Sequence, residues 1–122
     1  MQDLVGIVRN ESEMKQALEK IAALWKRARA TGVTGHREYN PGWHTALDLE
    51  HLLTVSEGIT RGAIERKESR GAHFREDYPD KSEECSKFNI VFKKSGTGEM
   101  QLRREPVREM PAELKQIIEE MK

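Results

Sequence analysis

A polar segment near the middle of the chain, residues 66–79, reads Arg66-Lys67-Glu68-Ser69-Arg70-Gly71-Ala72-His73-Phe74-Arg75-Glu76-Asp77-Tyr78-Pro79. The alternating charges alone are typical of any solvated helix end. The Gly71-Ala72 pair at its centre is not, because small residues let a backbone lie flush against another surface. Arg70 and Arg75 carry planar guanidiniums that form bidentate pairs with carboxylates. We therefore predict a docking loop over residues 66–79.

Two amphipathic helices are predicted upstream of this loop. Asn10 and Glu13 form a capping-box pair, which satisfies free backbone donors at a helix start, and the helix should end near Thr31-Gly32. Residues 32–42 hold the glycines, asparagine and proline of a loop. A second helix should run from about Trp43 to about Ser69, so the two helices pack through apolar stripes. The stripe positions are Met14, Ala17, Leu18, Ile21, Leu24, Trp25 and Ala28 in the first helix, and Ala46, Leu47, Leu49, Leu52, Leu53, Ile59 and Ala63 in the second.

Gly58 and Gly62 lie one turn apart in the second helix. Each glycine costs about 1 kcal/mol of helix propensity relative to alanine. Because both fall on one face, the pair favours the close approach of another backbone over mere tolerance of glycine.

A β-hairpin and a short helix are predicted after the loop. Residues 86–94 alternate, with Phe88, Ile90 and Phe92 on one face, and residues 96–98 supply a tight connection. Met100 and Leu102 continue the alternation on the return strand. Pro111 then opens a final helix, whose apolar side carries Leu114, Ile117, Ile118 and Met121.

The composition is that of one heavily solvated helical domain. The chain has 122 residues, of which 34% are charged and 6% aromatic, and its formal net charge is zero. A zero net charge gives no electrostatic footprint for nucleic acid. Cys85 is the only cysteine, which excludes an internal disulfide and favours a reducing, cytoplasmic setting. No apolar run approaches the roughly 18–20 residues that span a bilayer, so we expect a soluble chain without direct membrane insertion.

Local patterns that could carry chemistry are incomplete. His44, Asp48 and His51 could share one helix face, but zinc sites also need a further ligand and a second shell. Cys85 lies among acidic neighbours that disfavour a thiolate. Ser69 and His73 lack the orienting acid and oxyanion hole of a catalytic triad. We therefore predict no catalytic, cofactor-binding or metal-ligating residue in this chain.

The polar segment also carries a family resemblance. Residues 66–73, followed by Arg75, Asp77 and Pro79, resemble the hallmark of the C-terminal domain of succinate dehydrogenase and fumarate reductase flavoproteins. Val5-Gly6-Ile7-Val8-Arg9 looks like the lead-in of that family, and the two helices and the hairpin follow in the expected order. The resemblance covers at least residues 4–106. After Pro79 the sequence departs from the usual family pattern, which leaves the subfamily open.

The resemblance implies a mainly α fold: a three-helix, spectrin-repeat-like bundle with its first helix truncated, followed by a β-hairpin and a short C-terminal helix. It implies residues 1–80 as the bundle domain and residues 81–122 as the hairpin and helix extension. The first helix would begin upstream of Met1, so we expect a domain fragment with apolar surface left uncovered, which favours docking or self-association.

The resemblance also implies a role without chemistry of its own. The parent subunit would oxidise succinate or reduce fumarate with FAD, while this chain would hold none. Its partners would be the FAD-binding and capping domains and an iron–sulfur subunit, in a cytoplasmic complex peripheral to the inner face of the cell membrane. We predict interdomain docking by Arg70, Gly71, His73, Arg75 and Asp77. Replacing Arg70 with alanine should weaken assembly and barely change the stability of the isolated domain.

Two alternatives remain open from the sequence. The chain could be a free-standing helical interaction module, although the helix that starts upstream favours a domain of a larger protein. It could also be the equivalent domain of L-aspartate oxidase, since that family carries a similar Glu-Ser-Arg-Gly segment, here residues 68–71.

Overall fold

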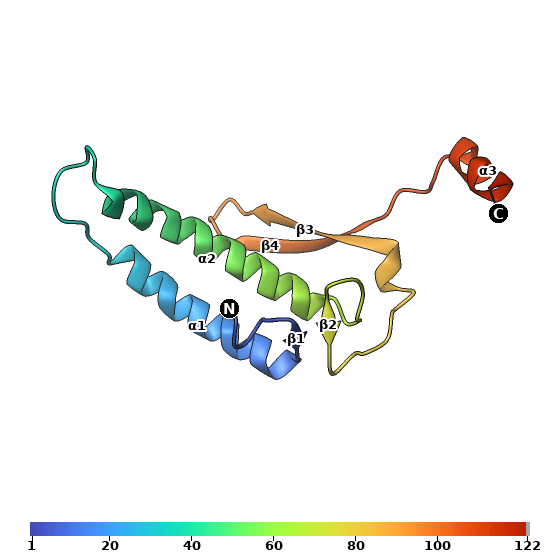
Figure 1. Cartoon of the computed structure of the whole chain (residues 1–122), viewed down its shortest axis with the longest axis horizontal. Helices are drawn as coiled ribbons and strands as arrows, with labels where there is room; N and C mark the ends of the chain where they lie inside the picture. Colours follow the sequence, from blue (N-terminus) through green and yellow to red (C-terminus); the bar gives the residue numbers. More distant parts are fainter. Residues whose placement is uncertain (122) are drawn as a thin grey trace.

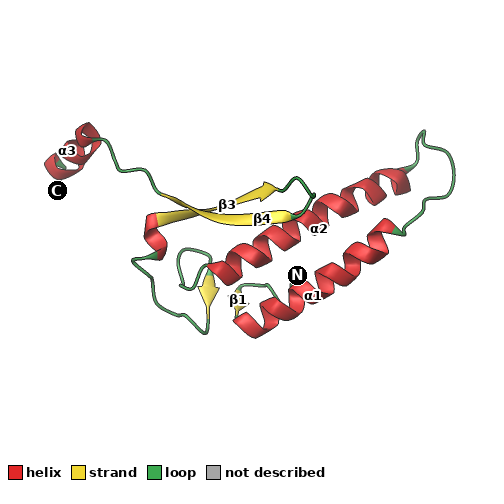
Figure 2. Cartoon of the chain, turned by 180° about the vertical axis from the view of Figure 1, so that it is seen from behind, coloured by secondary structure: helices red, strands yellow, loops and turns green. Residues whose placement is uncertain are grey.

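A helical hairpin forms the body of the molecule, and a β-hairpin lies along one of its helices. Figures 1 and 2 show these two layers, with the last helix held away from both. The computed structural model describes residues 1–121. In chain order the elements are β1 (Val8–Arg9), α1 (Glu11–Arg29), α2 (Pro41–Glu65), β2 (Phe74–Arg75), a 3₁₀ turn η1 (Cys85–Lys87), β3 (Phe88–Lys94), β4 (Met100–Pro106) and α3 (Ala112–Glu120).

Helix α1 begins where the capping pair predicts. The side chain of Asn10 accepts a hydrogen bond of 2.9 Å from the backbone N–H of Glu13, which satisfies one of the free donors of the first turn. Acidic residues lie in the first turn and basic residues in the last, an arrangement that suits the helix dipole. The helix ends at Arg29, two residues before the predicted end.

Helix α2 is shorter at its C-terminal end than the sequence predicts. Asn40 caps its start through the N–H of Gly42 at 3.0 Å, and Pro41 occupies the first turn. The helix ends at Glu65, because Arg66 takes an extended conformation with ψ 95°. The prediction that it continues to Ser69 is wrong, because residues after Glu65 turn back and supply a side chain that bonds the last carbonyls of α2.

The core between the helices is small. Met14 and Ala17 of α1 pack with Ala63 of α2 and with Val5. Val5 belongs to a single turn in which its N–H donates to the carbonyl of Met1 at 2.8 Å. Much of the predicted apolar stripe stays outside this core: Leu47, Leu52 and Ile59 of α2 are 49%, 63% and 47% exposed, and Leu24 of α1 is 43% exposed.

The β-hairpin follows the predicted alternation. Phe92 pairs with Leu102 in an antiparallel register, so the apolar side chains of both strands share one face. That face lies on the glycines of α2: a Cβ on Gly62 would lie 3.4 Å from Cζ of Phe92, and one on Gly58 would lie 3.7 Å from Cε of Met100. The glycines thus admit side chains of the hairpin, and not another backbone as the sequence suggested.

Helix α3 lies apart from the rest of the molecule (Figure 1). It begins after Pro111, as predicted, but Leu114, Ile117 and Ile118 of its apolar side are about half exposed. Within residues 1–121, no helix combines the length and apolar content needed to cross a membrane. The mainly α fold class with a following hairpin and final helix is confirmed, while the division at residues 80 and 81 stays a prediction.

Candidate functional site

The predicted docking loop is folded around a two-residue turn. The backbone N–H of Arg70 donates to the carbonyl of His73 at 2.8 Å, and the N–H of His73 donates back at 3.1 Å. Gly71 has φ +60°, a conformation that a residue with a Cβ adopts at a cost. Both residues of the tip, Gly71 and Ala72, are exposed. The turn therefore presents a small, smooth tip, and glycine is required there by conformation.

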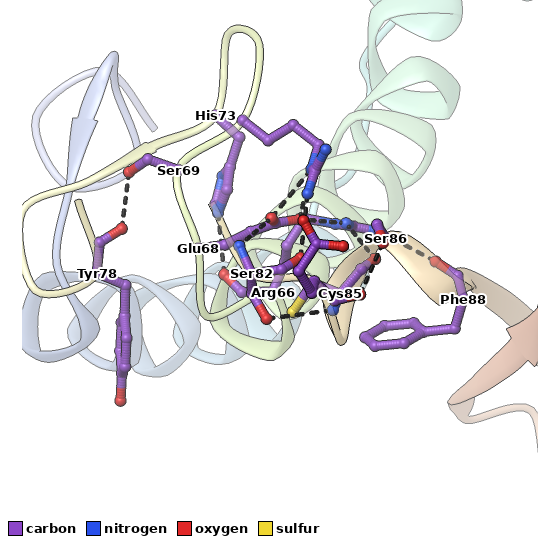
Figure 3. Close-up of polar contacts among 11 residues, drawn as sticks. Arg66, Glu68, Ser69, His73, Tyr78, Ser82, Cys85, Ser86 and Phe88 are labelled. Carbon is purple, nitrogen blue, oxygen red and sulfur yellow. Dashed lines mark hydrogen bonds and ion pairs between the residues drawn. The ribbon is translucent and has the colours of Figure 1, made fainter. Parts of the chain in front are cut away.

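Glu68 anchors the base of this turn. Its side chain is 0% exposed, yet its carboxylate accepts bonds from Arg66 at 2.6 Å, from Nε of Arg70 at 3.0 Å and from the N–H of Ser82 at 2.9 Å. Figure 3 shows this cluster, with Arg66 and Ser82 drawn beside Glu68. Burial alone would raise the pKa of Glu68, but the Ser82 N–H and both guanidiniums outweigh it and lower the pKa. Glu68 is thus a buried anion that holds together the end of α2, the turn at Arg70 and the segment at Ser82.

The two arginines on Glu68 reach further into the chain. Arg66 donates to the carbonyls of Cys85 at 3.0 Å and Phe88 at 3.3 Å, so the end of α2 is fastened to the start of β3. Arg70 also donates to the carbonyl of Ser82 at 3.1 Å. Because these bonds lie within the chain, they favour a structural role for Arg70, and we expect its loss to lower stability, which differs from the expectation from sequence.

Arg75 joins the ends of the two long helices. Its side chain is fully buried; it donates to the carbonyl of Ala63 at 2.8 Å and to both carboxylate oxygens of Asp77, at 2.7 and 2.6 Å. Asp77 in turn accepts from the N–H of Glu11 at 3.0 Å. A cation therefore meets the C-terminal end of α2 and an anion meets the N-terminal end of α1, each of the sign that the helix dipole favours. The Arg75 pair lowers the pKa of Asp77 to about 2.

Ser69 holds the two sides of the segment together. Its hydroxyl accepts from the N–H of Arg75 and donates to the carbonyl of Tyr78, each at 2.8 Å; Figure 3 shows the contact with Tyr78. The guanidinium of Arg75 lies 4.9 Å from the ring centre of Tyr78, a cation–π contact. The Ser69 hydroxyl is therefore used for structure and makes no bond to the His73 ring.

The geometry fixes the protonation state of His73. Nδ1 lies 3.0 Å from Nη1 of Arg9, and Nε2 lies 3.0 Å from the carbonyl oxygen of Arg66. Since a guanidinium can only donate, Nδ1 must accept, and Nε2 must carry the proton that it donates to Arg66. Burial lowers the pKa of His73, the Arg66 carbonyl opposes this, and the charges of Arg9, Arg75 and Arg66 lower it further. His73 is therefore a neutral link between the docking loop, β1 and the end of α2.

All five predicted docking residues lie in this segment, and the structure divides them by role. Gly71 shapes the exposed tip, while His73 bonds Arg9 and Arg66. The other three, Arg70, Arg75 and Asp77, are engaged in ion pairs within the chain. Sequence reasoning missed Glu68, Arg66 and Arg9. The signal that could have found Glu68 is its position two residues from Arg66 and two from Arg70.

The side chains of the other candidates take no part in this cluster. Cys85 is a buried free cysteine, and its carbonyl, not its thiol, takes part in the network. His44, Asp48 and His51 do not form a ligand set: in the part of the chain that the structure describes, no three His, Cys, Asp or Glu side chains gather as metal ligands do.

Comparison with known proteins identifies this architecture. The family described as "Fumarate reductase flavoprotein C-term" matches residues 1–118. Mycobacterium smegmatis Sdh1, solved in complex with UQ1, superposes with a TM-score of 0.89 and 36% identity over 98% of this chain and 20% of its own. The fumarate reductase flavoprotein subunit of Haemophilus influenzae is 37% identical over 68% of this chain and 14% of its own length. The L-aspartate oxidase of Yersinia pestis is 40% identical over 68% of this chain and 15% of its own.

These matches define a class, the C-terminal helical domains of flavoprotein oxidoreductases. The chain belongs to the fumarate reductase flavoprotein C-terminal family, as the segment at residues 66–79 indicated. It spans 14–16% of the length of the curated relatives it matches.

Two grooves lie beside the docking loop. One groove, lined by Arg66, Ile59 and Phe92 among others, measures about 300 Å³, and a second, lined by Arg70 and Cys85 among others, about 460 Å³. The guanidiniums of Arg66 and Arg70 are committed to Glu68. The two guanidiniums are therefore not free to bind the phosphates of FAD.

Proposed function

We propose that this chain is the C-terminal domain of a flavoprotein subunit that interconverts succinate and fumarate. The observation that carries the proposal is the match to Sdh1, which covers 98% of this chain but only 20% of that protein. In this proposal the FAD-binding and capping domains occupy the rest of the subunit, hydride passes between the dicarboxylate and FAD there, and an iron–sulfur subunit accepts the electrons. The assembled complex lies on the cytoplasmic face of the cell membrane.

The role proposed for this domain is docking. Gly71 places the tip of the loop at the surface, while Glu68, Arg75 and Asp77 hold its base rigid. A loop that is already ordered loses little conformational entropy on binding. Phe74 of the loop, at 42% exposure, and Val8 of the adjacent strand β1, at 49%, supply apolar contact area. Arg70, Gly71, His73, Arg75 and Asp77 thus act together, some by contact and some by shaping the contact surface.

The domain boundaries proposed for this role are residues 1–80 and 81–122. The bundle would carry the docking loop, and the hairpin extension would brace it. The bracing is supported by Arg104 of β4, which bonds Glu65 at the end of α2 at 2.7 Å and lies 4.5 Å from the ring centre of Phe88.

Reconstitution tests the proposal. The purified chain is mixed with Sdh1 from which the matching segment has been removed, and flavin absorbance, co-elution and succinate–dye turnover are measured. We expect no flavin band and no turnover from the chain alone, and co-elution with a gain in turnover from the mixture. A flavin band or turnover from the chain alone would contradict the noncatalytic role. Failure to co-elute would contradict the docking role.

A second candidate, the equivalent domain of L-aspartate oxidase, is favoured by the relative that is 40% identical. The two candidates differ in substrate. The full-length flavoprotein that contains this chain should reduce a dye with succinate under the first proposal and with L-aspartate under the second, so one assay with both acids separates them.

A further inference from the structure

Arg9 differs from the other arginines around the docking loop in having no acid of its own. Arg66 and Arg70 pair with Glu68, and Arg75 pairs with Asp77. Arg9 donates from Nε to the carbonyl of Gly6 at 2.8 Å and from Nη1 to the His73 ring at 3.0 Å, both neutral acceptors. Among residues 1–121 no carboxylate lies within ion-pair distance of Arg9, and no acceptor bonds its Nη2.

The two neutral bonds hold this guanidinium in place. Gly6 and His73 fix two of its three nitrogens, and His73 is itself fixed by the Arg66 carbonyl. A guanidinium held this way retains its full positive charge and loses little freedom when it binds an anion. Charge-assisted bonds from arginine to a carboxylate are about twice as strong as neutral ones, so this arrangement favours an acidic partner.

The fixed guanidinium lies at an apolar groove. The groove of about 300 Å³, here called the Arg9 groove, is lined by Arg9, His73, Ile59, Gly62, Ile90 and Phe92 among others. Ile59 is 47% exposed and Phe92 is 37% exposed, so apolar surface lies beside the positive charge. An occupant that suits both features carries a carboxylate next to an apolar side chain.

We propose that the Arg9 groove receives a segment of the flavin-bearing part of the parent flavoprotein, with an Asp or Glu carboxylate on Arg9 and a neighbouring apolar side chain against Ile59 and Phe92. This inference rests on the proposed function, and it adds the site and the chemistry of the partner. This chain covers 20% of Sdh1, so 80% of that protein lies outside the matched part. In such a relative the proposed occupant would belong to the same polypeptide. Charge complementarity to Arg9 sets its acidic character.

Calorimetric titration of chain variants into Sdh1 lacking the matched segment tests this inference. Arg9→Gln should weaken binding about tenfold or more, as expected when one partner of a desolvated charge pair is lost. It should also make binding less sensitive to salt, because fewer charges are screened. Arg27→Gln, which removes the same charge from the exposed last turn of α1, should bind like the wild-type chain.

A second pair of variants leaves Arg9 intact. Ile59→Glu places a carboxylate in the Arg9 groove and should block docking, while Leu47→Glu is the matched control, because Leu47 lies on the same helix and is 49% exposed. Thermal melts by circular dichroism check that each variant is folded.

The possible results separate this inference from the proposal on which it rests. Wild-type binding that is unaffected by Arg9→Gln and Ile59→Glu would overturn the groove and leave the docking role standing. No wild-type binding would overturn both. Self-association of the chain that Arg9→Gln abolishes would show a second copy in the groove and would overturn the proposed occupant.

Discussion

Arg75 and Asp77, two residues apart in sequence, form a two-bond ion pair that connects the C-terminal end of α2 to the N-terminal end of α1. Arg75 takes the carbonyl of Ala63 that the next turn of α2 would otherwise bond, and Asp77 takes the first N–H of α1. The pair therefore satisfies backbone groups that a helical hairpin leaves free at its open end.

Asp77→Ala should lower the free energy of unfolding by about 3 kcal/mol, because the buried guanidinium of Arg75 loses both short bonds to a carboxylate. Only Glu11, 3.7 Å from Nη2 of Arg75, then remains as a counter-charge. Urea denaturation measures the change. Glu76→Ala is the control, since Glu76 is exposed and lies next in sequence, and it should change stability by less than about 0.5 kcal/mol. Equal stability of the two variants would mean that Arg75 finds another partner or water.

His73 should make stability depend on pH in the weakly acidic range. Its pKa is lowered from 6.5 in the folded chain, so the unfolded chain takes up the proton first as pH falls. Stability should therefore be full above pH 6.5 and decline below it. Denaturant midpoints between pH 8 and pH 5 measure this, and His73→Gln should remove part of the decline. Nitrogen NMR should show the neutral ring with its proton on Nε2.

Arg70→Ala should lower the free energy of unfolding by about 1–2 kcal/mol, because it removes hydrogen bonds to the charged Glu68. This value lies at the low end for such bonds, since the Arg70 side chain is 38% exposed and water screens the pair. Glu68 keeps Arg66 and the Ser82 N–H, so the chain should remain folded. Lys81→Ala, at an exposed position nearby, should have little effect. A melting temperature unchanged by Arg70→Ala would mean that Arg70 does not stabilise the chain and acts only in contacts with a partner.

Two glycines should respond to alanine with opposite signs. Gly58→Ala should stabilise the chain by up to about 1 kcal/mol, because helix propensity rises and the nearest atom, Cε of Met100 at 3.7 Å, is an ordinary contact. Gly71→Ala should destabilise it by about 1 kcal/mol, because φ is +60°. Thermal melts of both variants give the signs, and stabilisation by Gly71→Ala would contradict the turn geometry described above.

The helices and the hairpin could be predicted because their signals are local. The cap at Asn10 bonds Glu13, three residues on, and the alternation in β3 reports the face that meets α2. The true end of α2 could not be predicted, because Arg75 bonds Ala63 from 12 residues away. The hydrogen bond between Arg9 and His73 joins residues 64 positions apart, and no local sequence pattern predicts such a contact.

The docking loop was found from its composition, but its internal roles were not. An arginine on a docking surface and an arginine buried against helix carbonyls look alike in sequence. Arg75 differs from Arg9 because the folded loop brings the carboxylate of Asp77 against its guanidinium. That contact depends on how the loop folds back.

The bond from Asp77 to the first residue of α1 also sets an order of events during folding. Glu11 and Asp77 are 66 residues apart, whereas the two long helices meet through a short connection, and contacts between distant residues close later because more chain entropy is lost. On a ribosome, which releases the chain from its N-terminus, α1 would emerge with its cap at Asn10 in place. The N–H of Glu11 would stay unbonded until α2 and the loop had been synthesised. The bond between Asp77 and the N–H of Glu11 is thus among the last contacts of the helical hairpin to form.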